Sequence, residues 1–340
     1  MHIFIPAIIC IFIVCFYTTA HASCLLFNEN ERLSNYCLLE TVKGKVVNQN
    51  TAIIVSQKLR REGYFGGLES SEWSTRFYPD FDYSDNINGG NPDKPLILGE
   101  LEFEGDPELI KQEGVIGTVN FQGSNRATFG SGRYLQTNIS AAYSYSPKHK
   151  NGFSNANLSS CYKHKLTTTN FLDLCASASH QNKDISTDAN KSLSVSMSKL
   201  RFDNNIGFSE GQIGIINLIS DEYTQNQLAF SWDIIHKRNF YSALRLRFGN
   251  PVETQTALNY GLDFNISRMI NNRKFSLGLS HELNDGGMLF GENRSDTINK
   301  ISLVSNLNAN SQIKFGYTST DSSIDYFDQS YPTIKLTFDW

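Results

Sequence analysis

The chain has 340 residues, of which 40% are hydrophobic, 12% aromatic and 19% charged, and its formal net charge is -4. After the first two dozen residues no apolar run approaches the roughly 20 residues of a membrane-spanning helix, which excludes a helical membrane protein. The aromatic content excludes a disordered chain, and the balance of 30 basic against 34 acidic residues leaves no basic stripe for nucleic acid. We therefore expect a β-rich protein with no nucleic-acid partner.

Residues 1–22 have the features of a signal peptide. Ile3 to Tyr17 form an apolar run, and Ala20-His21-Ala22 offers small residues at both positions that signal peptidase recognises. We expect export with cleavage before Ser23. The run is preceded by neither Lys nor Arg, which leaves an uncleaved anchor as an alternative, and Cys24 leaves lipidation as another.

Four cysteines remain after the signal peptide, in a compartment that permits disulfides. Proximity favours Cys24 with Cys37, and Cys161 with Cys175 on the two arms of a hairpin centred near Thr168. Three connectivities are possible. A zinc site is the rival interpretation, but the spacings lack paired ligand motifs, so we expect no metal and no cofactor.

Residues 23–72 do not alternate between apolar and polar. Thr51 to Glu62 is typical of a short amphipathic helix, with Asn50 as its cap and Gly63 as its stop. This segment is predicted to be either a plug or a periplasmic appendage.

Residues 73–340 alternate with period two in many separate runs, as half-buried strands do. Turn residues punctuate the runs, the intervening face is small and polar, and aromatic residues cluster near strand ends. A soluble sandwich would show the same alternation, but these further features favour a transmembrane antiparallel β-barrel with its apolar face toward lipid. The strand number is predicted as 12 to 16, with 14 as the best fit to the turns.

The proposed strand starts number fifteen, whereas bacterial single-chain barrels have even strand numbers, so either one start is wrong or one strand is missing. They lie near Trp73, Leu96, Gly114, Tyr134, Phe153, Asn170, Lys191, Ile206, Gln225, Phe240, Thr256, Lys274, Asn299, Ser311 and Pro332.

Charged residues on the polar faces of these strands predict a charged lumen. An acidic patch is expected from Asp80, Asp82, Glu100, Glu102 and Glu104, the last three on the second strand. Such a patch concentrates cations or basic partners, or it is neutralised by Arg245, Arg247 or Lys335.

Two other constellations are weaker. Asp85, Asn86, Asn88, Asn91 and Asp93 offer oxygen ligands, but their spacing departs from a calcium loop and favours a polar turn. His281 and Glu282 suggest no catalytic triad, because no Gly-x-Ser-x-Gly turn accompanies them. We expect no enzyme.

The last strand alternates to the end of the chain, with Ile334, Leu336, Phe338 and Trp340 on one face. This ending resembles the carboxy-terminal signal of Gram-negative outer-membrane proteins. The resemblance implies residence in the outer membrane, contact with its lipid, and recognition by the barrel-assembly machinery.

The stretch Tyr78 to Gly90 resembles the opening strand and loop of surface lipoprotein assembly modifiers, and Ala52 to Tyr64 is similar to one helix of their tetratricopeptide domain. That resemblance implies a barrel, commonly of 14 strands, that helps move lipoproteins across the outer membrane, with a surface lipoprotein as client. The sequence therefore favours a transport or secretion barrel that assists lipoprotein export. A passive solute channel is the alternative, and a barrel hydrolase comes third.

Overall fold

The structure is a computed structural model, and it describes residues 24, 27, 29–43, 49–67, 69–98, 100–253, 255–271, 273–289, 291–308 and 310–338. The predicted signal peptide and Trp340 lie outside the described residues. Among the helices of the described ranges, none has the length and apolarity to cross a membrane.

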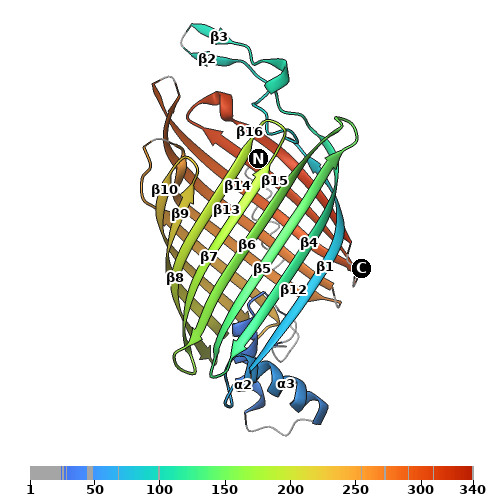
Figure 1. Ribbon diagram of the computed structural model, residues 1–340, viewed down its shortest axis with the longest axis vertical. Coiled ribbons are helices and arrows are strands. Elements are labelled where there is room, and N and C mark those ends of the chain that lie inside the picture. Colours follow the sequence, from blue (N-terminus) through green and yellow to red (C-terminus); the bar gives the residue numbers. More distant parts are fainter. Residues whose placement is uncertain are drawn as a thin grey trace.

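Fourteen strands close into an antiparallel barrel in which neighbours in sequence pair and β16 returns to β1 (Figure 1). This confirms the predicted fold class and strand number. The barrel strands are β1 (Glu69–Ser84), β4 (Gly114–Phe129), β5 (Arg133–Ser146), β6 (Asn151–Lys165), β7 (Asn170–Asn182), β8 (Thr187–Asp203), β9 (Gly207–Ser220), β10 (Thr224–His236), β11 (Phe240–Gly249), β12 (Ala257–Ile270), β13 (Arg273–Leu289), β14 (Glu292–Asn308), β15 (Ser311–Ser322) and β16 (Gln329–Phe338).

Strand β8 shows why the chain forms a membrane barrel. Leu193, Val195 and Met197 point outward and are 58%, 52% and 53% exposed. The serines between them point into the barrel, where Ser192 shares a hydrogen bond with Ser177. An apolar exterior suits lipid and a hydroxyl-rich interior suits water, so the barrel is built to span a bilayer around a polar lumen.

The strand expected near Leu96 is not part of the barrel. It is divided between β2 (Leu96–Leu98) and β3 (Leu101–Phe103), which pair only with each other. This hairpin lies in the long connection between β1 and β4 and projects from the end of the barrel opposite the helices (Figure 1). Removing that start from the predicted set leaves fourteen. A short 3-10 turn, η1 (Pro107–Leu109), follows the hairpin, and η2 (Asp325–Phe327) precedes β16.

Two helices precede the barrel. Helix α3 (Gln49–Arg61) confirms the predicted helix, but it starts at Gln49, so Asn50 lies inside it and is not its cap. Gly63 follows with a φ of +80°, a conformation that favours glycine. Helix α2 (Glu31–Val42) was not predicted, and its cap is Asn30.

Both predicted disulfides are present, Cys24–Cys37 and Cys161–Cys175. The first ties the start of the N-terminal segment to α2, and the second joins directly paired positions of β6 and β7.

Connections between strands at the helix end of the barrel are short. Those between β4 and β5, β8 and β9, and β12 and β13 span residues 130–132, 204–206 and 271–272, whereas the β1–β4 connection at the other end spans 85–113. Bacterial barrels carry short turns on the periplasmic side. This comparison predicts that the helix end faces the periplasm, and we call it the periplasmic end on that prediction.

Candidate functional site

Among the cavities of the described part of the lumen, two meet at Arg245. The first, of about 640 Å³, is bounded by the start of α2 and by strands on both sides of the barrel. The second, of about 420 Å³, lies against the wall formed by β11 to β16. Both volumes are in the range of small-molecule sites, so the lumen and the segment below it form the candidate site.

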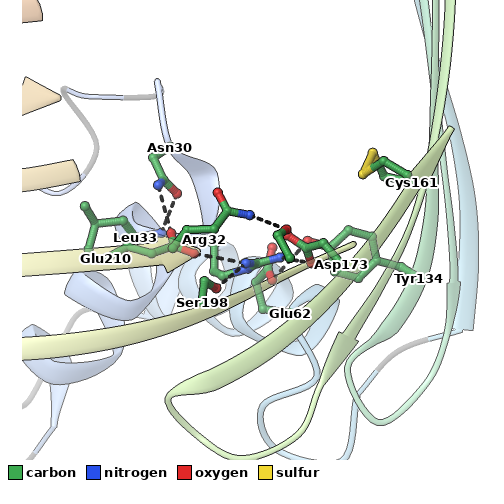
Figure 2. A network of polar contacts seen from close by, with 12 residues as sticks. Asn30, Arg32, Leu33, Glu62, Tyr134, Cys161, Asp173, Ser198 and Glu210 are labelled. Carbon is green, nitrogen blue, oxygen red and sulfur yellow. Dashed lines mark hydrogen bonds and ion pairs between the residues drawn. A yellow bond between two sulfur atoms is a disulfide. The ribbon is translucent and has the colours of Figure 1, made fainter. Parts of the chain in front are cut away.

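Arg32 fixes α2 to the barrel wall (Figure 2). Its guanidinium contacts Asp173 of β7 at 2.6 Å and Glu210 of β9 at 3.0 Å, and donates to Ser198 of β8 at 2.7 Å. The guanidinium also lies 4.4 Å from the ring centre of Phe171. Arg32 is only 6% exposed, so one buried cation from the helix holds three neighbouring strands.

The residues next to Arg32 extend these contacts around the barrel. The Asn30 amide accepts from the Leu33 N–H as the helix cap and donates to Glu210 and to Asp233 of β10, at 2.8 and 2.9 Å. Glu31 pairs with Arg126 of β4 at 3.0 Å, and Glu29 pairs with Lys274 of β13 at 2.5 Å. The start of α2 is therefore bound to opposite parts of the wall.

A second buried pair secures the end of the segment. Glu62, which follows α3 and is 1% exposed, contacts Arg126 at 2.8 Å. Burial alone raises the pKa of Glu62, but the nearby Arg126 and Arg32 lower it further than burial raises it, so the pKa lies below its ordinary value. For Arg32, burial lowers the pKa, but Glu210, Tyr134 and Asp173 outweigh burial and raise it. Both groups are charged at neutral pH.

An apolar cluster completes the attachment. Leu33, Cys37 and Leu59 of the helical segment pack with inward-facing Phe171, Leu200, Phe208 and Ile235 at the periplasmic ends of β7 to β10. These inward apolar side chains depart from the polar interior seen higher in the barrel. We call the described part of residues 24–64 the plug segment, because its polar and apolar contacts lie at the helix end of the barrel. Its role as a plug or as a periplasmic appendage stays a prediction.

The predicted basic residues both face the cavities. Arg247 contacts Glu282 at 2.8 Å and Asp263 at 3.6 Å. Arg245 is paired in register with Asp263, yet no carboxylate of the described residues lies within 4 Å of it. The two arginines therefore differ: one is neutralised by the wall and the other is open to a solute.

Asp80 and Asp82 lie on β1, but Asp80 serves barrel closure. Among the described residues, three pairs join β1 to β16, whereas sixteen join β1 to β4. Asp80 is 1% exposed, contacts Lys335 of β16 at 2.6 Å and accepts from Asn120 at 2.8 Å. Its charge is bound within this seam.

Glu100, Glu102 and Glu104 lie at the β2–β3 hairpin and not on a barrel strand. The sequence placed them in the lumen because these glutamates alternate with Leu101 and Phe103, which is the period of a barrel strand. The structure corrects this, and the three glutamates are not brought together with Asp80 and Asp82.

The asparagine-rich loop after β1 forms a polar turn. The side-chain Oδ1 of Asn86 accepts from the Gly89 and Gly90 N–H groups, and the side-chain amide of Asn88 donates to the Ile110 carbonyl. The described residues contain no group of acidic, histidine or cysteine side chains arranged for a metal.

The histidines do not form a triad within the described chain. His281 hydrogen-bonds to Tyr260 and Asn299 on the outer face. His236 contacts the Ser242 hydroxyl at 2.8 Å, but its other ring nitrogen has no carboxylate partner among the described residues. Glu282 belongs to the lumen wall.

On β16, Ile334 is 50% exposed on the outer face, and the Phe338 ring lies 6.3 Å from that of Phe81. The row of Ile334, Leu336 and Phe338 thus occupies the last strand as expected, while recognition by the assembly machinery stays a prediction.

Sequence reasoning missed Arg32, Asp173, Glu210 and Asp233. A signal was present, because inward positions at one end of β7 to β10 are phenylalanine, leucine and isoleucine. Inward apolar residues need a cover.

Comparison with known proteins gives a likeness of fold. The chain is similar to the KdgM porin, with 11% identity over 56% of this chain and 93% of that one and a TM-score of 0.33. For OccK2 (OpdF) of Pseudomonas aeruginosa the identity is 8%, the coverage 81% and 98%, and the TM-score 0.42. For OprB of Pseudomonas putida the identity is 6%, the coverage is 86% of this chain and 96% of that one, and the TM-score is 0.44.

No family model and no curated protein matches the chain. None of these comparisons supports the resemblance to surface lipoprotein assembly modifiers.

Proposed function

We propose that this chain is an outer-membrane channel for small hydrophilic solutes, whose periplasmic mouth is controlled by the plug segment. The observation that carries the proposal is the pair of adjoining polar cavities inside a lipid-facing barrel. Hydroxyl, amide and charged side chains line them, as a water-filled path requires. This proposal replaces lipoprotein export as our preferred function, since no contact in the described structure favours a lipoprotein client.

The plug segment has the chemistry of a removable cover. It is attached through ion pairs as well as through the apolar cluster, and it lies beside the first cavity instead of filling the barrel. Water can replace ion-pair partners when the segment withdraws, whereas a fully apolar core could not be hydrated at low cost.

Planar-bilayer recording of the purified, refolded protein tests this function. We expect small single-channel currents from the wild type and larger ones when the plug segment is loosened by Arg32→Met. Liposome swelling with neutral sugars of increasing size then gives the width of the path. Absence of current and of swelling in both proteins, despite a heat-sensitive shift in gel mobility that shows a folded barrel, would overturn the proposal.

A further inference from the structure

The charges of the second cavity are unequal. Its cations are Arg245, Lys300 and Lys314, and its carboxylates are Asp263 and Glu282. Both carboxylates are engaged by Arg247, which reaches in from β11, and Glu282 also lies 3.8 Å from Lys300. The acids of this wall are therefore already neutralised by protein cations.

Arg245 and Lys314 remain without such a partner. No carboxylate of the described residues comes within 4 Å of either side chain, although both line the cavity. In register, Lys314 of β15 lies opposite Lys335 of β16, and the Lys335 ammonium is taken up by Asp80. Asp82 lies opposite Lys335 on the far side, and the charge of Lys314 also acts on Asp82, although the two do not form an ion pair within 4 Å.

We propose that the wall formed by β11 to β15 is a binding path for small organic anions, with Arg245 and Lys314 as its two binding cations. This inference rests on the proposed channel function and names its substrate class. A guanidinium holds a carboxylate through two parallel hydrogen bonds, and an ammonium holds it as a point charge. Ser280, Ser302, Thr318 and Thr333 line the same cavity, so hydroxyl groups of a solute also find partners.

Arg245 and Lys314 act as two successive binding sites for the anion. Four strand intervals separate β11 from β15, which places their backbones about 19 Å apart along the wall at about 4.8 Å per interval. A small carboxylate passes along this wall from one cation to the other, and Lys300 on β14 lies on the way.

Reversal potentials in a KCl gradient test the path. We expect the wild type to prefer chloride over potassium. Arg245→Gln and Lys314→Gln should each reduce that preference by about fivefold, which corresponds to the loss of one charge contact in water. The double variant should lose the preference. Arg245→Lys should keep most of it. Lys199→Gln, which removes an exposed cation from the outer face of β8, is the matched control and should change nothing. Preference for potassium in the wild type, or an unchanged preference in the double variant, overturns the path.

Binding of lactate, measured by saturation-transfer NMR on the purified barrel, separates this inference from the channel function. Transfer in the wild type and its loss in the double variant support the site even where no current flows. Currents without any saturation transfer to lactate leave a channel but overturn the organic-anion site.

Discussion

Arg32→Met is the change that most directly tests how the plug segment is held. Methionine keeps the apolar stem but removes the cation, so Asp173 and Glu210 stay buried at 8% and 6% exposure without their partner. Removing one member of a buried ion pair costs about 3 to 5 kcal/mol. That cost is relieved when the segment withdraws and water reaches the two carboxylates, so the substitution favours release. At about 1.36 kcal/mol per tenfold, the released population rises by about 150- to 5,000-fold.

Two measurements read the released state, namely the fraction of time that single channels spend at high conductance and the rate at which protease cuts the N-terminal segment. The matched control is Lys43→Met at the end of α2, whose side chain is 69% exposed and pairs with Glu40 at 3.1 Å. An exposed pair contributes about 0 to 1 kcal/mol, so this variant should resemble the wild type. If Arg32→Met and Lys43→Met behave alike in both measurements, the buried contacts of Arg32 do not hold the plug, and the reasoning fails.

Three further predictions follow from the same contacts. Because the folded-state pKa of Glu62 is lowered, its pair with Arg126 stabilises the folded protein at a pH above the ordinary pKa of 4.5, and this stability is lost as the pH falls through the folded-state pKa. Acid should therefore release the plug segment and make it accessible to protease. The Glu62→Gln variant should show no such pH-dependent change. Glu282→Gln should increase chloride preference in reversal-potential measurements, because it removes the carboxylate that Arg247 and Lys300 share and leaves Asp263 near Arg247, and an unchanged potential would show that Glu282 does not neutralise these cations. Ile213→Arg on the outer face should cost about 2 to 4 kcal/mol near the bilayer centre and deplete the protein from outer-membrane fractions, whereas the inward Gln212→Arg should assemble normally.

The barrel could be predicted because each strand contacts lipid with one face and the water-filled lumen with the other. Lipid outside and water inside impose a period of two on every strand, so fourteen of the proposed starts correspond to real strands. The strand predicted near Leu96 was wrong for the same reason. A hairpin in a loop whose apolar and polar side chains alternate shows the same period of two as a barrel strand. Only the pairing partners, which a single sequence does not show, distinguish the hairpin from the wall.

Helix α2 and its contacts could not be predicted in the same way. Its residues from Arg32 to Leu39 are all buried, so the helix lacks the polar stripe that marks an amphipathic helix. Arg32 meets Asp173 and Glu210 across 141 and 178 residues of sequence, and only the barrel's closure brings them together. Arg247 and Glu282 could each be placed in the lumen by periodicity, but their pairing needed the register of β11 to β13.

The plug segment and the basic wall act on the same path. While α2 is seated, Asp173 and Glu210 are occupied by Arg32, so the carboxylates at the periplasmic mouth attract no solute. Withdrawal of the plug exposes these carboxylates at the mouth, while Arg245 and Lys314 keep their positions on the wall. The same carboxylates attract Arg32 back to its seat, so the charges that hold the plug also favour its return once it is displaced.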